Sequence, residues 1–251
     1  MRRLALLAAV CAGLAGCGGS GTVSAGGNRP PLVVSAASSM KEALSACAPD
    51  FRAARVKLQF AGSDELAAQI RAGVPVDVFA SANTKLPDAL AREGRLRAPV
   101  AFASNQLVLA VPRGGDVAAL RDVERPGTKL VVGAEGVPVG DYTRKVLGRL
   151  GGRAEQAVLA NVRSNEPDVK GVVGKLLQGA ADAGFVYASD VKAAGGKLRA
   201  IRLAASLEPT AVYGAGAVRG SRHAAQAAAF VQDLRQGRCH DALLAAGFGE
   251  P

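Results

Sequence analysis

The sequence predicts an α/β protein of two domains, and three observations support this expectation. The chain has 251 residues, 49% of them hydrophobic, which is enough for one large or two medium-sized cores. From Pro30 onward, short β-rich runs alternate with segments of helical periodicity almost to the C-terminus. These elements fall into two successive series, and the chain then returns from the second series to the first.

The first series predicts one domain. Residues 31–38, 56–63 and 76–82 are expected to be strands, and the first and third are almost continuously apolar, as buried parallel strands are. Between the first two strands, Leu44 and Cys47 belong to an apolar series at helical spacing. This order of strands and helices indicates a mostly parallel sheet that is covered by helices.

The second series predicts another domain. Residues 107–112, 129–135 and 182–190 are expected to be strands, and residues of about 140–151 and 168–179 are expected to be helices. The alternation again indicates a sheet flanked by helices.

Two segments are expected to cross between the domains. LVLAVP (107–112) follows a polar turn and precedes a break, and AVYGAGAV (211–218) returns the chain to the first domain. An Ala-rich helix from about 221 and a short helix from about 240 then lie on that domain. The predicted limits are 31–107 with 215–251 for domain 1, and 108–214 for domain 2.

The N-terminus has the pattern of an export signal. Arg2 and Arg3 precede LALLAAVCAGLAG, an apolar run that is long enough for a secretory signal and too short to span a membrane. The run ends at Cys17 in LAGC, which resembles the lipobox of bacterial lipoproteins, so we expect removal of residues 1–16 and lipidation of Cys17. Residues 17–30 predict a flexible tether. The protein is therefore expected in the periplasm or on the outer face of the cell membrane, held by a lipid anchor.

The charge favours anions without indicating nucleic acid. The formal net charge is +10, and it becomes +8 when Arg2 and Arg3 leave with the signal. Only 4% of the residues are aromatic, Trp is absent, and no stretch interleaves aromatic residues with Lys and Arg. A nucleic-acid-binding groove is therefore not expected.

Two cysteines remain for the folded protein when Cys11 lies in the signal and Cys17 is lipidated. These are Cys47 and Cys239, which are far apart in the sequence. In an oxidising compartment they form a disulfide, whereas the alternative is a pair of buried thiols, and the sequence leaves both open.

Four junctions between a strand and a helix have the residues of anion sites. Ser39 stands three residues before Glu42, which is the spacing of a capping box, and Ser63 is expected at the N-cap of the next helix. In the second series, Pro138 suits a first helical turn and is followed by Val139, and Asp168 precedes the helix that starts at Val169. Each serine taken alone is better explained as a simple helix cap.

The recurrence of these junctions in both series points to a shared site. A helix start presents unpaired N–H groups, so it binds anions without Lys or Arg, and a serine adds a hydroxyl donor. Ligands of open α/β sheets bind beyond the carboxyl ends of the strands, where these junctions lie. We therefore expect the four helix starts to converge on one small oxyanion between the domains.

Three segments carry a resemblance to a known family: VVSAASSMKEAL, FAGSDELAAQIRAGVPVDVFASAN and GFVYASD. From about residue 31 to 250 the chain resembles the periplasmic molybdate-binding proteins, which are the substrate-binding components of molybdate ABC transporters. The resemblance implies a periplasmic-binding-protein-like fold of type II, in which two crossing strands join two domains, each a mixed, mostly parallel sheet flanked by helices. It also implies a monomer that captures molybdate, and tungstate with it, and delivers it to the transporter permease.

The family resemblance implies a ligand set without a countercharge. The two serine hydroxyls fall on Ser39 and Ser63, the main-chain amides on Val139 and Val169, and the tyrosine hydroxyl on Tyr187. No cofactor is implied, and molybdenum enters only inside the oxyanion, without direct ligation by the protein.

Two residues depart from the family pattern. Val139 stands where the family usually has alanine, and Asp64 follows Ser63 where many relatives carry a neutral residue. The larger side chain of Val139 is expected to tighten the pocket. The Asp64 carboxylate would repel a dianion unless it points to solvent.

Alternatives remain on the same fold and outside it. Another tetrahedral oxyanion, sulfate, thiosulfate or phosphate, would use the same donors, and protonated phosphate would also benefit from an acceptor such as Asp64 or Asp168. An enzyme is not expected, because a serine hydrolase needs a base, only His223 and His240 exist, and no G-x-S-x-G occurs. A structural or adhesive lipoprotein would not need four anion-ready helix starts.

Overall fold

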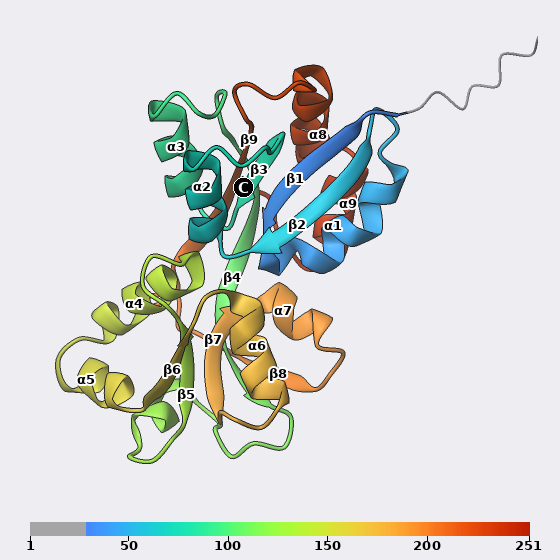
Figure 1. Cartoon of the computed structure of the whole chain (residues 1–251). Coiled ribbons are helices and arrows are strands. Elements are labelled where there is room, and N and C mark those ends of the chain that lie inside the picture. The colour runs from blue at the N-terminus through green and yellow to red at the C-terminus, as the bar shows by residue number, and fades with distance from the viewer. Residues whose placement is uncertain (1–28) are drawn as a thin grey trace, which may run out of the picture.

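The computed structural model describes residues 29–251, which form two lobes, one above the other in Figure 1. Lobe 1 contains strands β1 (Pro31–Ala37), β2 (Arg55–Ala61) and β3 (Val78–Ser81) with helices α1 (Lys41–Cys47), α2 (Ser63–Arg71), α3 (Lys85–Arg92), α8 (Ala224–Gln236) and α9 (Arg238–Ala245). Lobe 2 contains strands β5 (Leu130–Gly133), β6 (Val162–Glu166), β7 (Ala183–Tyr187) and β8 (Leu198–Arg202) with helices α4 (Pro138–Leu150), α5 (Gly152–Ala160), α6 (Val169–Leu177) and α7 (Ala188–Ala193). Short 3₁₀ turns occupy Ser38–Met40, Ala48–Asp50 and Leu120–Glu124.

Two long strands, β4 (Val100–Pro112) and β9 (Thr210–Ala217), connect the lobes. Up to Gln106, β4 pairs with β9, and from Leu107 onward it pairs with β7 and β8. The polar turn expected before residue 107 is therefore wrong, because residues 104–106 lie inside β4 and pair with β9. The strand order is β2-β1-β3-β9-β4-β7-β5-β6, with β8 paired to β4. The domain limits 31–107 with 215–251, and 108–214, stay a prediction.

Parallel and antiparallel pairs are segregated in this sheet. The pairs β1–β2, β1–β3, β5–β6 and β5–β7 are parallel, whereas the antiparallel pairs all involve β4 or β9. The mixed α/β architecture with flanking helices is therefore confirmed. Within each lobe, the carboxyl ends of the parallel strands point toward the other lobe, so the loops that follow them meet in the middle of the molecule (Figure 1).

Strands that are buried in the structure are the ones that the hydrophobic pattern of the sequence predicts most clearly. β1 and β3 are largely buried, and they are the strands with nearly continuous apolar runs. β6 has the sequence VRSNE, which holds one apolar residue, so no hydrophobic pattern marks it. The segment expected to be one strand at 182–190 is divided, because β7 ends at Tyr187 and α7 begins at Ala188.

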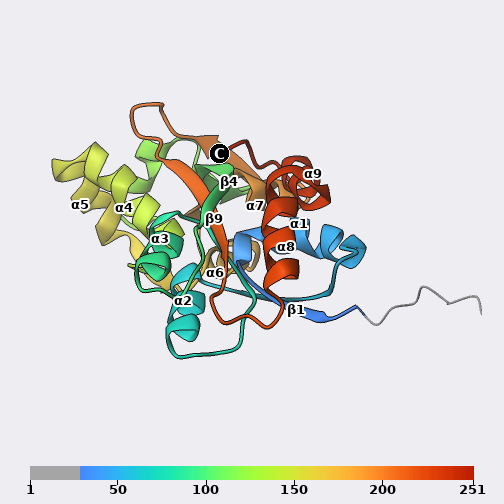
Figure 2. The same ribbon diagram turned by 90° about the horizontal axis from the view of Figure 1, so that it is seen from above.

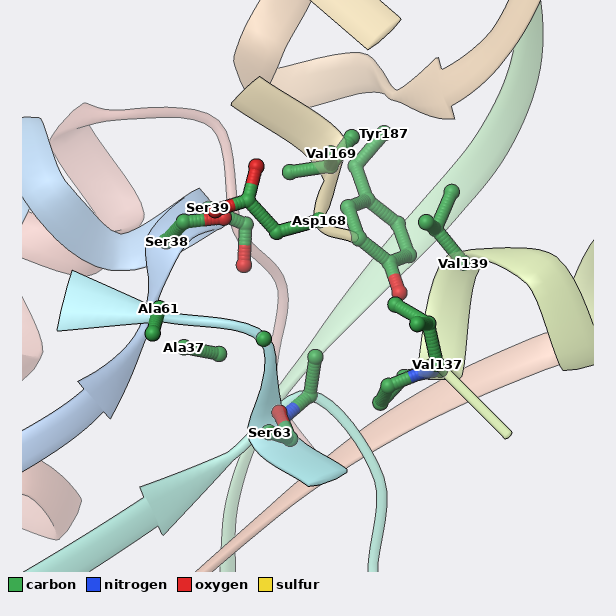
Figure 3. Close-up of a pocket in the computed structure, with 13 residues that line it drawn as sticks. Ala37, Ser38, Ser39, Ala61, Ser63, Val137, Val139, Asp168, Val169 and Tyr187 are labelled. Atoms are coloured by element: carbon green, nitrogen blue, oxygen red, sulfur yellow. The ribbon is translucent and has the colours of Figure 1, made fainter. Parts of the chain in front are cut away.

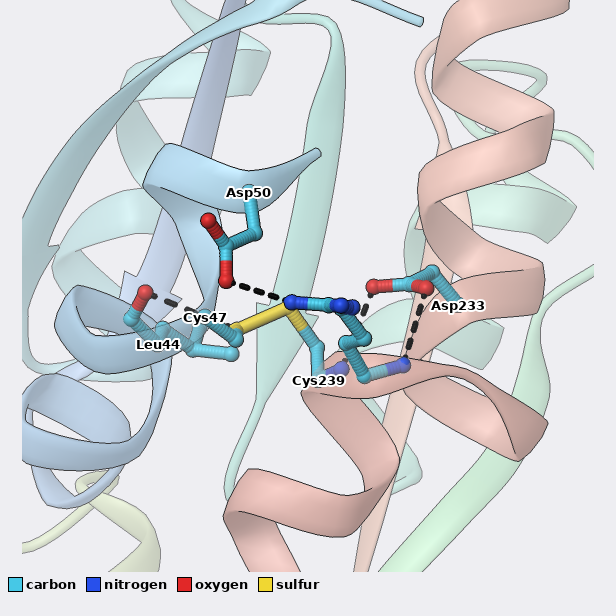
Figure 4. Close-up of a disulfide and its surroundings, with 6 residues drawn as sticks. Leu44, Cys47, Asp50, Asp233 and Cys239 are labelled. Atoms are coloured by element: carbon cyan, nitrogen blue, oxygen red, sulfur yellow. Dashed lines mark hydrogen bonds and ion pairs between the residues drawn. A yellow bond between two sulfur atoms is a disulfide. The ribbon is translucent and has the colours of Figure 1, made fainter. Parts of the chain in front are cut away.

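A disulfide joins Cys47 at the end of α1 to Cys239 in the first turn of α9, with Cα atoms 5.1 Å apart (Figure 4). Around it, Arg238 donates to Asp50 at 2.7 Å, and the Asp233 carboxylate accepts from the backbone N–H groups of Arg238 and Cys239. The bond ties the C-terminal helices to lobe 1, beside the N-terminal strands (Figure 2).

Residues 1–28 are outside the part of the chain that the structure describes. The predicted export signal at 1–16, the lipidation of Cys17 and most of the predicted tether at 17–30 fall there. Among the described helices, none is both long and apolar enough to cross a membrane.

Candidate functional site

A small cavity lies between the lobes, where the carboxyl ends of strands from both of them meet (Figure 3). Its volume is about 10 Å³, which is about the room for one water molecule and far less than the ~300–1,000 Å³ of pockets for drug-sized molecules. The lining consists of residues 37–39, 61–63, 137–139 and 168–169 with Ala82 and Tyr187. The cavity therefore suits a small ion better than an organic ligand.

The structure brings all the sequence-predicted site residues to this cavity. Each of them is exposed by 4% or less. They are Ser39, Ser63, Val139, Val169 and Tyr187. The first two come from lobe 1 and the other three from lobe 2, so the cavity exists only where the lobes meet.

Ser39 does not cap a helix, so the capping-box interpretation with Glu42 is wrong. Ser39 lies inside the 3₁₀ turn Ser38–Met40, α1 starts at Lys41, and neither helix start has a side-chain cap. The Ser39 hydroxyl instead lies 3.0 Å from the hydroxyl of Tyr213, a buried contact between residues far apart in the sequence. Because its hydroxyl is not engaged in capping, Ser39 can donate a hydrogen bond into the cavity.

Ser63 is also not an N-cap. The N-cap of α2 is Gly62, and Ser63 is the first residue of the helix. Its hydroxyl oxygen accepts a hydrogen bond from the backbone N–H of Ala82 at 3.1 Å. Since the oxygen is the acceptor in that bond, the hydroxyl proton of Ser63 is available to a ligand.

Two helix starts of lobe 2 contribute backbone amides. Pro138 is the first residue of α4, as predicted, and Val139 follows it, whereas Val169 is the first residue of α6. N–H groups in a first turn have no carbonyl partner within the helix, and the helix dipole gives them positive character. Asp168 is the N-cap of α6, and its carboxylate accepts from the N–H of Gly171 at 2.9 Å.

Tyr187 presents a hydroxyl that no other described residue satisfies. The side chain is 1% exposed, and its oxygen is buried without a hydrogen-bond partner in the described part of the chain. Figure 3 shows the ring reaching from the end of β7 toward the start of α4. Burial raises the pKa of Tyr187 well above its usual value, so the hydroxyl keeps its proton and acts as a donor. A buried polar atom without a partner is costly, and a ligand in the cavity would supply one.

The lobes touch each other around the cavity. Lys170 of α6 forms ion pairs with Glu42 of α1 at 2.8 Å and with buried Asp190 of α7 at 3.1 Å. Burial raises the pKa of Asp190 to about 6, and the neighbouring Lys170 opposes this rise. A Cβ atom placed on Gly62 would lie 2.5 Å from the carbonyl oxygen of Pro167, so the lobes are in close contact at this point.

The donor set determines what the cavity can bind. Asp168 is the one charged residue among the described residues that line it, and its carboxylate is engaged in capping α6. Asp64, the departure from the family pattern, does not line the cavity. Its Oδ1 is nevertheless buried without a hydrogen-bond partner among the described residues, next to the lining residue Gly62, so this oxygen does not point to solvent. The described residues contain no group of three or more His, Cys, Asp or Glu residues that could hold a metal ion. Hydroxyl and amide donors without metal ligands suit an anion that is rich in acceptor oxygens.

Tyr213 is a residue of this site that the sequence reasoning missed. It lies on β9, in a segment whose pattern indicates only a crossing strand. No signal near Tyr213 in the sequence identifies the contact with Ser39, because 174 positions separate the two residues.

Comparisons with known proteins agree with this geometry. A family model of bacterial extracellular solute-binding proteins matches residues 32–249. The chain is 32% identical over 255 aligned residues to the molybdate-binding protein ModA of Mycobacterium tuberculosis, covering 97% of this chain and 95% of that protein.

Solved structures support the fold. The periplasmic molybdate-binding protein of Azotobacter vinelandii superposes with a TM-score of 0.78 at 22% identity, covering 88% of this chain and 99% of that one. The sulfate-binding protein SubI of Mycobacterium tuberculosis superposes with a TM-score of 0.74 at 17% identity, covering 87% of this chain and 86% of that one. The expected periplasmic-binding-protein fold of type II is confirmed, and one fold serves proteins described for two different oxyanions.

Proposed function

Because the chain belongs to the bacterial extracellular solute-binding proteins, and among them to the molybdate-binding family, we propose that it captures molybdate, and tungstate with it, between its lobes. Ser39 and Ser63 donate through their hydroxyls, Val139 and Val169 through their backbone amides, and Tyr187 through its phenol. No cofactor takes part, and the molybdenum atom is cargo that the protein touches only through the oxygens of the anion.

One observation carries this proposal above the others. The Tyr187 hydroxyl is buried and unpartnered among the described residues, and it lines the same cavity as the two serines. A tetrahedral oxyanion offers several acceptor oxygens, so it can accept from both serines and from Tyr187 at once. The dianion gains charge-assisted hydrogen bonds without a buried countercharge, because the helix starts provide partial positive charge.

Phosphate and sulfate are the alternative ligands, and they differ from molybdate in protonation and in size. Phosphate that carries a proton requires an acceptor. One oxygen of the lining carboxylate, Asp168, accepts from Gly171, and the other oxygen can serve as that acceptor, so phosphate is the alternative that the titration below must separate. Sulfate can use the same donors as molybdate. Its bonds are shorter than those of molybdate. Because both anions are dianions, we expect the size of the bound anion rather than its charge to separate the two.

The proposal extends to the path of the ligand. The export signal would carry the protein to the periplasm or the outer face of the cell membrane, and the lipid on Cys17 would anchor it there. The protein would work as a monomer. Binding selects the arrangement in which the lobes meet, and this closed form is what the permease of an ABC transporter would recognise. The chain has no catalytic role in this scheme.

Isothermal titration calorimetry of the purified protein with molybdate, tungstate, sulfate and phosphate tests the assignment. We expect one molybdate or tungstate ion per chain, with sulfate and phosphate markedly weaker. At a concentration of 100 times its Kd, the bound ion should also add about 2.7 kcal/mol to the free energy of unfolding. Sulfate or phosphate binding as tightly as molybdate would contradict the molybdate assignment, and no binding of any oxyanion would contradict the class of function.

A further inference from the structure

Tyr213 lies behind the cavity and contacts one lining residue from each lobe, Ser39 and Tyr187. It lies on β9, one of the two strands that connect the lobes, and is fully buried. Its hydroxyl is 3.0 Å from the Ser39 hydroxyl of lobe 1, and its ring centroid is 5.8 Å from that of Tyr187 of lobe 2. Phe248 packs against the same ring at 5.2 Å, so the side chain is held firmly. Tyr213 itself does not line the cavity.

The direction of the hydrogen bond between Tyr213 and Ser39 follows from the surroundings. Burial raises the pKa of Tyr213 well above its usual value, so the phenol keeps its proton and requires an acceptor. The nearby Asn105 faces the Tyr213 oxygen as a hydrogen-bond donor, which lowers the pKa of Tyr213 against the effect of burial. Its amide also donates to Ser189 and its carbonyl oxygen accepts from the N–H of Gln106, so Ser39 Oγ is the acceptor that lies within hydrogen-bond distance of Tyr213. If Ser39 were the donor instead, the Tyr213 proton would be buried without the acceptor that Ser39 supplies, which is unfavourable.

We propose that Tyr213 is a positioning residue of the anion site: it donates its hydroxyl proton to Ser39 Oγ and thereby directs the Ser39 proton into the cavity. The inference rests on the proposed function, since it concerns how one proposed ligand residue is oriented. A serine hydroxyl rotates freely, and accepting one hydrogen bond leaves its own proton to be donated elsewhere. Tyr213 thus prepares the site before the anion arrives.

A double-mutant cycle on molybdate affinity tests this role, using wild type, Tyr213→Phe, Ser39→Ala and the double variant. Tyr213→Phe should weaken binding roughly tenfold when Ser39 is present, and should cause no further loss when Ser39 is replaced by Ala. A purely structural effect of Tyr213 would weaken both backgrounds by the same factor, so additive losses would overturn the proposal. Unchanged affinity in Tyr213→Phe would overturn it as well.

Two further variants serve as controls, one for the loss of a nearby tyrosine hydroxyl and one for the loss of the donor at position 213. Tyr142→Phe removes another tyrosine hydroxyl near Tyr187, but one without a bond to Ser39, and it should leave the affinity unchanged. If Tyr213→Phe does not fold, p-aminophenylalanine at position 213 keeps an N–H donor there and should bind as wild type does, so weak binding by a folded variant of this kind would contradict the proposal. Failure of wild type to bind molybdate would count against the proposed function instead, which separates the two tests.

Discussion

Lys170 and Glu42 form an ion pair across the gap between the lobes, with Nζ 2.8 Å from Oε2. Lys170 directly follows Val169, and Glu42 is three residues after Ser39, so the pair lies beside two proposed ligand residues from opposite lobes. Lys170 also lies 3.1 Å from Asp190, which keeps it in place within lobe 2. The pair therefore stabilises the arrangement in which the lobes meet, and neither of its residues lines the cavity.

Replacing Glu42 by Gln should weaken molybdate binding by up to about fivefold, because a partly exposed ion pair contributes about 0.2–1 kcal/mol. The Glu42 side chain is 49% exposed, so the loss should shrink as the salt concentration rises. Titration calorimetry at low and high ionic strength measures both effects. The control is Glu93→Gln, which removes the Arg71–Glu93 pair within lobe 1 and should not change affinity. Equal losses in the two variants would show that closure is not involved.

Gly62→Ala should interfere with closure while leaving the separate lobes intact. The Gly62 backbone, with φ −59° and ψ 139°, is available to alanine without strain. A Cβ there would lie 2.5 Å from the carbonyl oxygen of Pro167 in the other lobe and 2.8 Å from Oδ1 of Asp64 in its own lobe, but the Asp64 carboxylate is the end of a side chain that can rotate away. Overpacking of this kind costs ~1–3 kcal/mol, so molybdate affinity should fall roughly tenfold. Small-angle scattering with molybdate should show the variant more extended than wild type. Gly174→Ala, whose Cβ would meet no atom within 4 Å, is the matched control.

Tyr187→Phe should separate binding from stability. The hydroxyl has no partner among the described residues, so its removal should leave the free energy of unfolding of the ligand-free protein unchanged or slightly higher. A hydrogen bond to a charged ligand is worth about 1.5–3 kcal/mol, so molybdate affinity should fall by about 10- to 100-fold. Thermal unfolding without ligand and calorimetry with ligand give the two quantities. Undiminished affinity would mean that the phenol does not touch the anion.

Asp190 should make stability depend on pH between about 4 and 6. Burial raises its folded-state pKa from 3.8 to about 6. Within this window the folded protein holds a proton that the unfolded chain has already released, so the contribution of Asp190 to stability falls as the pH rises through the window and is constant above it. Urea unfolding of wild type and Asp190→Asn at several pH values isolates this contribution. The stability of wild type relative to the variant should decline from pH 4 to 6, and a rise over that range would contradict the assignment.

The α/β architecture, the two crossing strands and the four helix starts follow from the sequence pattern. Hydrophobic periodicity and local capping chemistry act over a few residues, so they are visible in a single chain. Pro138 was predicted in the first turn of a helix, where α4 has it, and Asp168 was expected just before a helix, where it proves to be the N-cap of α6. Strand β6 lacks such a signal because one apolar residue cannot establish a period.

The orientation of the hydroxyls was decided by tertiary structure. The sequence determined that serines stand where strands meet helices, and it suggested helix caps, whereas Ser63 accepts from Ala82 and Ser39 bonds to Tyr213. It left the pairing of Cys47 with Cys239 open, since 192 positions separate them. Contacts of this range depend on how whole lobes pack, and no local pattern encodes them. The sequence thus specified the donors, whereas the packing of Tyr213 of β9 against the turn after β1, and of Ala82 against Ser63, determined which groups their hydroxyls contact.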